Sequence, residues 1–430
     1  MKKKLYNIAI IGLGNIGSYL YNFLNKNKNT LSNKNNVQFK IAYVSAKNRN
    51  KKRSFKINKN QWISNYYEIL KKKNVDIIIE LIGGAEGPAK KLVFAALKNK
   101  KHVVTANKAL ISKYGDELSQ IAEKNKVNLE YEAAVCGGVP IIRSIKEGLI
   151  ANKISRIYGI FNGTSNYVLS SMDINKTSFD ETVKKSVKLG YAESNPTSDI
   201  NGEDVSSKVK ILTCLGFNSF INDSIHVEGI KNIDEEDISN ANKLGYKIKL
   251  MGFSELLNNK IFQRVHPTLV RKKSYIAGVD GVLNAVIIDG NPIGKNIIQG
   301  EGAGPSATTS ALISDISSIL RGNIKFPFGI SSNKRKKYSS GKITDLFFSS
   351  YIRLNVKDKY GVLADVTKIF SNNKVSIKRV LQSPYKNKKN SSIVIITHRS
   401  KDNYIQKTLK TLAKKSYIIK KPKLLRIENG

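Results

Sequence analysis

Acidic residues, cysteine and tryptophan are scarce in this 430-residue sequence. It has 33 aspartates and glutamates against 73 lysines and arginines, together with two cysteines and one tryptophan. Two cysteines, Cys136 and Cys214, cannot build a disulfide framework or a metal cluster, and such scarcity is typical of a reducing compartment. No apolar run reaches the length of a membrane-spanning helix. We therefore expect a cytoplasmic protein with no membrane partner.

The shortage of acids leaves a formal net charge of +40. A nucleic-acid-binding protein would concentrate such a charge on one face, beside aromatic or base-reading side chains. Here the lysines are spread along nearly the whole sequence among asparagines and isoleucines, a mixture typical of codon bias. Steering of an anionic substrate or cofactor, or weak adhesion to polyanions, is the other use of the charge. We predict no nucleic-acid partner.

The order of apolar and polar segments predicts three kinds of domain. In residues 1–135 strands alternate with helices, which predicts a parallel, doubly wound sheet of the Rossmann type. We expect its strands at 7–13, 37–44, 75–82, 102–105 and 127–134, its helices at 16–26, 88–99 and 110–124, and mobile polar loops at 25–36 and 47–60.

The remainder of the chain has a different order of apolar and polar segments. Residues 136–330 predict an α+β domain, with a helix over 137–148, strands at 155–161, 261–269 and 284–288, and a helix at 308–320 that returns to the first domain. Residues 331–347 are a basic linker. Residues 348–430 have the order βαββαβ of a ferredoxin-like module.

A glycine-rich turn follows the first expected strand and precedes a helix, which is the context of a dinucleotide-binding fingerprint. The first glycine permits the tight turn, the second lets the backbone approach a pyrophosphate, and the third lets helix and strand pack closely. The helix N-terminus then faces the anion. The residues of this GxGxxG turn are Gly12, Leu13, Gly14, Asn15, Ile16 and Gly17.

The end of the second expected strand, at residues 44–49, has no acidic side chain to bind a ribose 2′-hydroxyl. Its small and basic residues, Arg49 among them, suit a 2′-phosphate better. We therefore predict NADP as the cofactor, with NAD as the alternative.

Charged residues gather at two further places. Asp204 and Lys208 stand four residues apart at the start of an apolar-periodic segment, a spacing that puts both on one helix face. An ordinary solvated ion pair has the same spacing. Lys108 follows the strand at 102–105, at the edge where such sheets bind ligands, and could polarise a carbonyl. A surface lysine is the alternative.

Several segments together resemble homoserine dehydrogenases, in the order in which that family has them, and the resemblance covers nearly the whole chain. The residues around Asp204 and Lys208 are close to the family's signature. Residues 353–364 look like the start of an ACT domain. The other matching segments are 107–108, 132–140, 162–167, 191–208, 264–267, 280–285 and 300–304.

The resemblance implies NAD(P)H-dependent, reversible reduction of L-aspartate 4-semialdehyde to L-homoserine, in threonine, methionine and isoleucine biosynthesis. It implies that Lys208 is the proton donor, provided that burial brings its pKa toward working pH. Asp204 would orient Lys208, and Glu193 and Asp199 would bind the polar groups of the substrate. Lys108 would lie beside nicotinamide and substrate and share in stabilising the carbonyl oxygen.

The family also implies contacts that side-chain chemistry does not reveal. Gly83, Lys108 and Gly304 would touch the cofactor, and Glu301 stands as an acid close to that contact. A monovalent cation such as sodium would lie on backbone carbonyls of Glu132, Val135, Gly137 and Val139. We interpret Cys136, inside that segment, as a small buried residue rather than a nucleophile.

The family further implies a homodimer or a higher oligomer, and feedback control, with threonine as the candidate effector at paired ACT modules. Tyr360 stands where the family often has proline, a departure that bears on effector binding. The four histidines have no metal-ligand spacing, and we interpret His266 as structural. The alternative enzymatic interpretation is another amino-acid dehydrogenase with the same cofactor domain.

Overall fold

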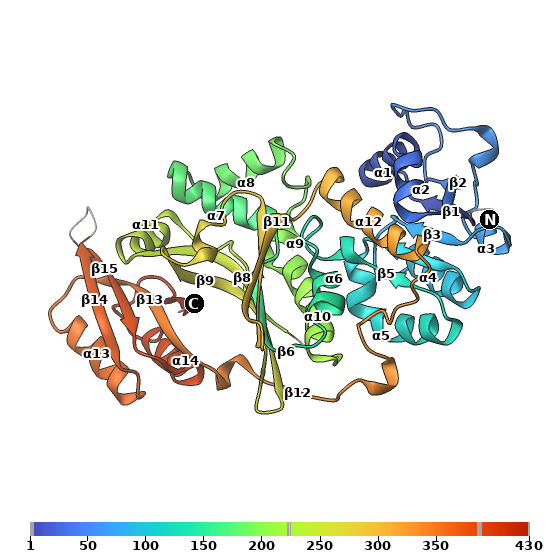
Figure 1. The fold of residues 1–430 in the computed structure, drawn as a ribbon. Coiled ribbons are helices and arrows are strands. Elements are labelled where there is room, and N and C mark those ends of the chain that lie inside the picture. Colours follow the sequence, from blue (N-terminus) through green and yellow to red (C-terminus); the bar gives the residue numbers. More distant parts are fainter. Residues whose placement is uncertain (1–3, 222, 224, 385–388, 429–430) are drawn as a thin grey trace.

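The computed structural model describes residues 4–221, 223, 225–384 and 389–428. The chain forms two β-sheets in an elongated molecule, with the amino-terminal sheet at one end and the carboxy-terminal strands at the other (Figure 1). In this described part, no helix is both long and apolar enough to cross a membrane.

The first sheet is parallel throughout and has the strand order β2-β1-β3-β4-β5, as predicted for a dinucleotide-binding domain. Its strands are β1 (Leu5–Ile11), β2 (Gln38–Ser45), β3 (Ile77–Glu80), β4 (His102–Thr105) and β5 (Leu129–Glu130). Both faces are covered, which explains why the strands are apolar at nearly every position. Along β1, Ile8 and Ile10 belong to one core, while Ala9 and Ile11 belong to the other.

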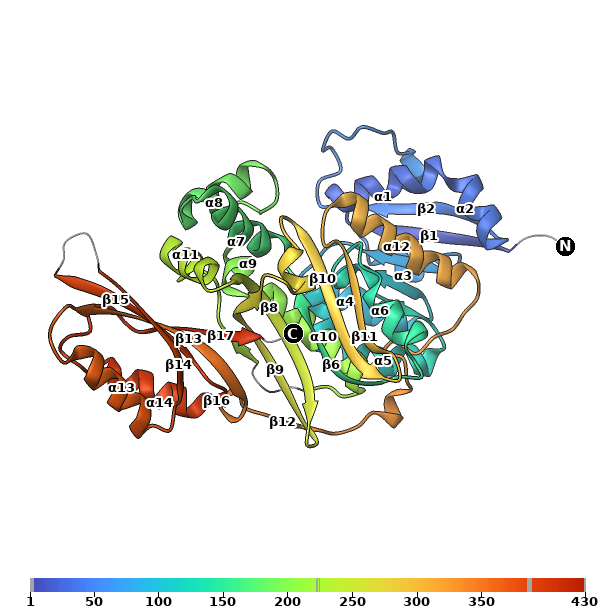
Figure 2. The same cartoon turned by 60° about the vertical axis from the view of Figure 1, so that its left-hand side comes forward.

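The helices divide between these two cores. On one face lie α1 (Asn15–Lys26) and α12 (Pro305–Leu320), and on the other α4 (Pro88–Lys98) and α5 (Lys108–Asn125). Helix α12 comes from far along the chain and packs against α1, so that the late segment does return to the first domain (Figure 2). A short helix α3 (Glu68–Lys71) precedes β3.

Three sequence-based expectations for residues 1–148 were wrong. The asparagine-rich segment at 25–36 forms α2 (Lys28–Asn35) rather than a loop, because tertiary hydrogen bonds of Asn35 to Ser317 and Arg321 fix its end. Only Leu129 and Glu130 of the expected strand at 127–134 pair with β4, after which the chain turns. The helix expected over 137–148 begins at α6 (Ile141–Arg143) and continues as a π-helical turn, Ser144–Gly148.

The second sheet runs β11-β10-β6-β8-β9-β17-β13-β15-β14 and spans two parts of the chain. The middle part contributes antiparallel strands, of which β8 and β11 were not predicted from the sequence. They are β6 (Lys153–Ile160), β8 (Tyr246–Leu257), β9 (Lys260–Arg271), β10 (Leu283–Asn291) and β11 (Gly294–Glu301).

One face of these middle strands packs against helices that carry the candidate site. The helices and short strand of this part are α7 (Gly163–Asn175), α8 (Phe179–Lys188), α9 (Thr197–Asn201), α10 (Glu203–Phe217), α11 (Glu235–Lys243) and β7 (His226–Val227). Helix α10 also contacts α5 of the first part, so that it lies between the two sheets.

The carboxy-terminal module has the predicted βαββαβ order, with the two-residue strand β16 (Ser400–Lys401) added. Its elements are β13 (Phe347–Lys357), α13 (Val362–Asn372), β14 (Ile377–Pro384), β15 (Asn390–Thr397), α14 (Asp402–Leu412) and β17 (Lys423–Glu428). The last strand, β17, lies parallel to β9 and antiparallel to β13, which joins the module to the middle sheet. The segment before the module also touches the sheet, because β12 (Ser339–Ser340) pairs with β9.

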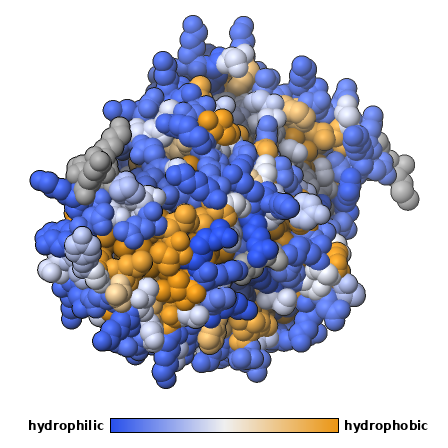
Figure 3. Space-filling model, turned by 90° about the vertical axis from the view of Figure 1, so that its left-hand side faces the viewer, coloured by the Kyte–Doolittle hydropathy of each residue, from blue (hydrophilic) through white to orange (hydrophobic). Residues whose placement is uncertain are grey.

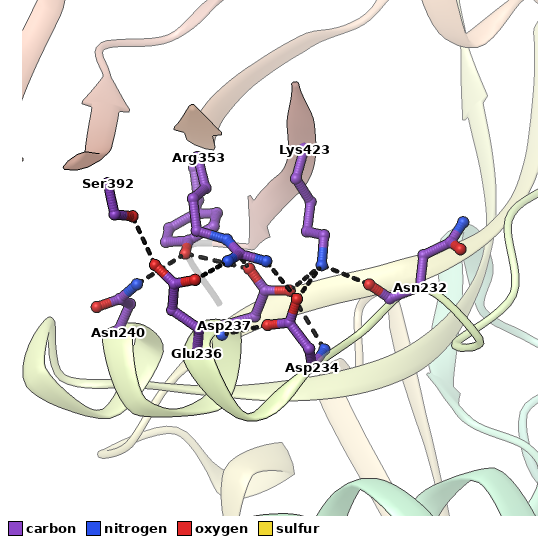
Figure 4. Close-up of polar contacts among 9 residues, drawn as sticks. Asn232, Asp234, Glu236, Asp237, Asn240, Arg353, Ser392 and Lys423 are labelled. Atoms are coloured by element: carbon purple, nitrogen blue, oxygen red, sulfur yellow. Dashed lines mark hydrogen bonds and ion pairs between the residues drawn. The ribbon is translucent and has the colours of Figure 1, made fainter. Parts of the chain in front are cut away.

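Ion pairs strengthen this junction on the side of α11 (Figure 4). Arg353 of β13 pairs with Asp234 (2.5 Å), Glu236 and Asp237 (2.8 Å), all at the start of α11. Lys423 of β17 pairs with Asp234 (3.0 Å) and Asp237 (2.5 Å). Two cations of the module thus face three carboxylates of the middle part.

The far end of the module has a different surface. Seen from that end, the molecule shows a patch of apolar side chains among polar ones (Figure 3). The edge strand β14 of this module exposes Val380 and Leu381. Exposed apolar side chains on an unpaired strand edge suit contact with another protein chain.

Candidate active site

The glycine-rich turn has the geometry that a dinucleotide requires. Gly12 follows β1 with φ +109°, and its N–H donates to the carbonyl of Ser45 (2.9 Å). A Cβ on Gly12 would lie 2.4 Å from the Leu81 oxygen, and one on Gly17 would lie 2.0 Å from the Gly12 oxygen. A Cβ on Gly14 would meet nothing within 4 Å. The first and third glycines are therefore needed for packing, while the second leaves open space at the N-terminus of α1 for a pyrophosphate.

The end of β2 presents arginines around the single tryptophan. The guanidinium carbons of Arg49 and Arg53 lie 5.5 Å and 5.3 Å from the Trp62 ring centre. Arg53 also donates hydrogen bonds to the carbonyls of residues 48, 49 and 51, which fixes the course of the loop. Arg53 was missed from the sequence, although its four-residue spacing from Arg49 was a visible signal.

A buried carboxylate orders the loop after β3. Glu80 is fully buried and accepts hydrogen bonds from the N–H groups of Ile82 (2.7 Å) and Gly83 (2.9 Å) and from the Thr105 hydroxyl (2.5 Å). Gly83, a predicted cofactor contact, has φ +86° and open space at its Cβ position. Sequence reasoning missed Glu80, whose signal was an acid ending an otherwise apolar strand.

Lys108 begins α5 at the carboxyl edge of the first sheet. Asn107 caps this helix by accepting a hydrogen bond from Leu110 N–H (3.1 Å), and its amide donates to the Gly84 carbonyl (2.8 Å). Lys108 Nζ lies 2.5 Å from Asp204 Oδ1, and the lysine side chain remains 42% exposed. The two candidate regions that lie far apart in the sequence therefore meet through this ion pair.

Asp204 is the centre of the polar cluster at the start of α10. Its other oxygen, Oδ2, accepts hydrogen bonds from Lys208 Nζ (2.7 Å) and from the Asn162 amide (2.9 Å). Lys208 also donates to the Phe161 carbonyl (2.6 Å). The helical spacing of Asp204 and Lys208 predicted from the sequence is present, but both side chains are buried rather than solvated.

Asn162 links a further predicted residue to this cluster. Its amide donates to Asp199 Oδ1 (2.7 Å) as well as to Asp204, while its side-chain oxygen caps α7 by accepting from Ser165 N–H (2.8 Å). Asp199, on α9, is thereby held beside Asp204. One asparagine side chain fixes both carboxylates relative to α7.

The electrostatics of the cluster are set by burial and by this pairing. Burial lowers the pKa of Lys208, but the carboxylate of Asp204, together with Cys136 and Asp199, outweighs burial, so the pKa lies above its ordinary value. Burial would raise the pKa of Asp204, yet Lys208 and Lys108 hold it well below its usual range. Burial, aided by Asp204, raises the pKa of Asp199. Lys208 is therefore an ammonium, and the condition set from the sequence, that burial brings its pKa toward working pH, is not met.

Glu193 is the predicted residue that the structure does not bring to the cluster. It is exposed on the loop between α8 and α9 and, among the described residues, has no hydrogen-bond or ion-pair partner. The neighbouring Tyr191 is anchored through its carbonyl, which accepts a hydrogen bond from the Thr164 hydroxyl (2.7 Å), and its ring lies 5.0 Å from that of Tyr167. The loop is therefore attached to α7 beside the cluster.

The segment proposed to hold a cation turns sharply. Cys136 and Gly137 have φ +56° and +35°, and a Cβ on Gly137 would lie 2.9 Å from the Gly302 oxygen. The Glu132 carboxylate is already engaged, because it accepts hydrogen bonds from the N–H groups of Ile142 (2.9 Å) and Arg143 (2.8 Å). The Glu132 side chain is therefore not left for an ion, and the carbonyls of Glu132 and Val139 already accept hydrogen bonds from Val135 N–H (3.4 Å) and Ile141 N–H (2.7 Å). Burial raises the pKa of the Cys136 thiol, as suits a packing residue.

The second predicted cofactor segment packs against this turn. Gly138 N–H donates to the Glu301 carbonyl (2.9 Å), while the Glu301 side chain is exposed. Gly304, at the N-terminus of α12, has φ +102° and open space at its Cβ position. His266 is buried in the sheet and stacks on Phe253, in keeping with a structural role. Over the described ranges, no three His, Cys, Asp or Glu residues are placed to hold a metal.

Comparison with known proteins identifies the family to which these domains belong. The family models that match are homoserine dehydrogenase over residues 140–317, the NAD-binding domain of homoserine dehydrogenase over 12–132, and an AHAS small subunit-like ACT domain over 352–420. Among curated relatives, the chain is 35% identical to a homoserine dehydrogenase of Helicobacter pylori, over 100% of both chains. It is 40% identical to that of Neisseria gonorrhoeae over 319 residues, which are 74% of this chain and 73% of the relative.

A solved structure extends the similarity to the whole fold. A homoserine dehydrogenase from Thiobacillus denitrificans superposes with a TM-score of 0.93 at 33% identity, covering 99% of both chains. The dinucleotide turn, the Asp204–Lys208 helix and the carboxy-terminal module all lie within the matched length. The chain belongs to the homoserine dehydrogenase family.

Proposed function

We propose that this enzyme catalyses the reversible, NADP-dependent reduction of L-aspartate 4-semialdehyde to L-homoserine. The observation that carries the proposal is the meeting of Lys108 and Lys208 on the single carboxylate of Asp204, at the carboxyl edge of a dinucleotide-binding sheet. Two ammonium groups side by side suit a reaction in which negative charge develops on a carbonyl oxygen.

Lys208 is the proposed proton donor. Two of its three N–H groups donate to Asp204 and to the Phe161 carbonyl, which leaves the third, as far as the described residues go, for the substrate oxygen. Its raised pKa keeps it protonated at neutral pH, as donation during reduction requires. In the oxidative direction the same nitrogen would accept the proton back, after losing its own to solvent.

Lys108 and Asp204 have supporting roles. Lys108 adds positive charge near the substrate oxygen, and Asp204 orients both lysines. When bound, a nicotinamide would supply the hydride chemistry at the aldehyde carbon, in either direction. Asp199 and Glu193 are the proposed ligands of the substrate's amino group. Asp199 is held beside Asp204 by Asn162, and Glu193 is exposed on the loop between α8 and α9.

The residues of this chain fit a dinucleotide. The proposed contacts of the pyrophosphate and nicotinamide ends are the turn at 12–17, Gly83, Lys108 and Gly304. Arg49, with Arg53 beside it on Trp62, is the proposed contact of a 2′-phosphate, which favours NADP over NAD. A monovalent cation such as sodium is proposed on the carbonyls of Glu132, Val135, Gly137 and Val139.

The carboxy-terminal module is proposed to make the enzyme responsive to threonine. Its strand β17 lies in the middle sheet, so that a change in the module reaches the strands that pack against α10. A homodimer is proposed because both ends of the second sheet, β11 and β14, are edges within the described chain. The two unpaired, buried cysteines support a cytoplasmic site.

A direct assay tests the proposal. Oxidation of NADPH and of NADH is followed at 340 nm with L-aspartate 4-semialdehyde, and in parallel with other short aldehydes that lack its amino or carboxylate group. We expect turnover with the semialdehyde, a higher kcat/KM with NADPH, and little turnover with the truncated aldehydes. A preference for a different amino-acid substrate would support the alternative dehydrogenase instead.

A further inference from the structure

A second concave site lies away from the active site, between the middle sheet and the carboxy-terminal module. It is a cavity of about 710 Å³, bounded on one side by Arg156, Glu255 and Arg264, and on the other by the start of β13, by β16 and by the end of β17. Its volume falls in the range of small-molecule sites. Arg264 stacks on Phe253, in the core on the sheet face opposite α10, so the cavity is separate from the Lys208 cluster.

Arg264 forms the floor of this cavity and is not fully paired. Its side chain is 2% exposed, and Nη2 donates to Glu255 Oε1 (2.6 Å). Its Nε and Nη1 are buried without a hydrogen-bond partner among the described residues. The guanidinium carbon lies 4.2 Å from the Phe253 ring centre and 5.3 Å from that of Phe348. Buried charged donors without acceptors are costly, so an acceptor that reaches this guanidinium would be favourable.

The carboxylate that pairs with Arg264, that of Glu255, also pairs with a second arginine. Glu255 Oε1 also accepts from Arg156 Nε (2.9 Å), so that one oxygen faces two guanidinium groups. Burial lowers the pKa of Arg264; Glu255 opposes this effect and the neighbouring Arg156 adds to it. The floor therefore has capacity for a further anion.

The rim adds positive charge and apolar surface. Six cationic side chains line the cavity against four carboxylates, which leaves an excess of two positive charges. The rim cations are Lys260, Lys295, Arg399 and Lys401. Beside them, Leu257 and Phe347 are 45% and 53% exposed. An anion with a short apolar body matches both features.

We propose that this cavity binds a small organic carboxylate with a short aliphatic body, with its carboxylate on Arg264 and its body against Leu257 and Phe347. Arginine is suited to this contact because its planar, weakly hydrated guanidinium binds carboxylates well even when buried. The bound molecule would touch strands of both the middle sheet and the carboxy-terminal module. The site is independent of the dehydrogenase reaction.

Calorimetric titration of the full-length protein, without cofactor or substrate, tests the site directly. The probes are isovalerate, which has the carboxylate and the body, 3-methylbutanol, which has the body alone, and inorganic phosphate, which has the charge alone. We expect saturable binding of isovalerate, at least tenfold weaker binding of phosphate, and none of the alcohol. Absence of saturable isovalerate binding would overturn the proposal, and equal binding of phosphate would overturn the organic class of ligand.

Variants locate the binding. Arg264→Gln is expected to weaken isovalerate binding at least tenfold, while Arg379→Gln, an exposed arginine on β14 outside the cavity, leaves it unchanged. If Arg264→Gln does not fold by circular dichroism, the rim double variant Arg399→Gln, Lys401→Gln serves in its place and should bind at least threefold more weakly. Unchanged binding in the folded cavity variant would overturn the assignment.

Discussion

Lys108 and Asp204, 96 positions apart in the sequence, form a 2.5 Å ion pair between the start of α5 and the start of α10. The pair connects the dinucleotide-binding sheet to the helix that carries Lys208. Because Asp204 also binds Lys208, the two lysines are held together in spite of their like charge. The proposed chemistry depends on this arrangement, and the first two predictions address it.

Lys208→Ala is expected to lower kcat for semialdehyde reduction by about 100- to 10,000-fold, the range typical of a lost general acid. NADPH affinity, measured by fluorescence titration, should not change, because Lys208 is not among the proposed cofactor contacts. Lys210→Ala, two positions along the same helix and facing another direction, is the matched control and should retain wild-type turnover. Wild-type turnover in Lys208→Ala would remove the assigned role.

Asp204→Asn should change the pH dependence of reduction. In the wild type, Asp204 raises the pKa of Lys208 above 10.5, so the rate should fall only as pH rises above that value. Without the carboxylate, burial and Lys108 both favour the neutral amine, so the alkaline limb of kcat should move to lower pH. A pH–rate profile between pH 7 and 11 measures the shift, and an unmoved limb would contradict it. Asp199→Asn, a carboxylate that touches neither lysine, should move the limb much less.

Local sequence signals predicted much of this fold and site. The spacing in the GxGxxG turn and between Asp204 and Lys208 determines local geometry directly, because a turn or a helix face follows from a few neighbouring residues. The alternation of strands and helices likewise predicted the first sheet, and the βαββαβ order predicted the last module.

Long-range contacts could not be predicted from the sequence. The helix α2 depends on Asn35 reaching α12, and the pairing of β17 with β9 depends on how two domains meet. The sequence allowed burial to bring the pKa of Lys208 toward working pH, whereas the direction of the pKa depends on the distance to Asp204, which the sequence does not give. The part of Glu80 in ordering the loop after β3 needed the position of Thr105 on the neighbouring strand.

Two glycine variants should separate packing from cofactor binding. Gly17→Ala places a Cβ 2.0 Å from the Gly12 oxygen, so we expect a lower melting temperature and loss of cofactor binding together. Gly14→Ala meets nothing within 4 Å and has an ordinary φ of −73°, so the melting temperature should hold. The methyl group introduced by Gly14→Ala would occupy the space proposed for the pyrophosphate, so the KM for NADPH should rise. Equal effects of the two substitutions would contradict the assigned roles.

Arg49→Ala should alter cofactor preference. A charge-assisted hydrogen bond to a 2′-phosphate contributes about 1.5–3 kcal/mol, so the KM for NADPH should rise by about 10- to 100-fold. The KM for NADH, which has no such phosphate, should stay nearly constant. Steady-state kinetics with both cofactors measure the ratio, and Arg53→Ala tests whether the second arginine acts through the loop or directly. Equal changes for NADPH and NADH would argue against the phosphate contact.

Arg353→Met should weaken the junction between the module and α11. The side chain is 5% exposed and pairs with three carboxylates, of which Asp237 is fully buried while Asp234 and Glu236 are partly exposed. Its loss removes one of the two cations that pair with the buried Asp237, which should lower the free energy of unfolding by about 3 kcal/mol. The pKa of Asp234 is lowered to about 2, although burial alone would raise it, because Arg353 and Lys423 stabilise its carboxylate. The stabilisation of the fold by the ionised Asp234 carboxylate is therefore complete at pH values above its ordinary pKa of 3.8, and it is lost as the pH falls toward 2. Asp237, whose pKa burial raises, opposes it in part.

The difference in stability between wild type and Arg353→Met should consequently be larger at pH 7 than at pH 3. Urea unfolding at the two pH values measures it, with Arg379→Met, an exposed arginine of the same module, as the control that should change neither value. A pH-independent difference would show that Arg353 acts by packing alone, since an apolar contact does not titrate. A difference that grows at low pH would contradict the assigned charge pairing, because protonation of Asp234 and Asp237 removes the repulsion that the missing guanidinium leaves behind.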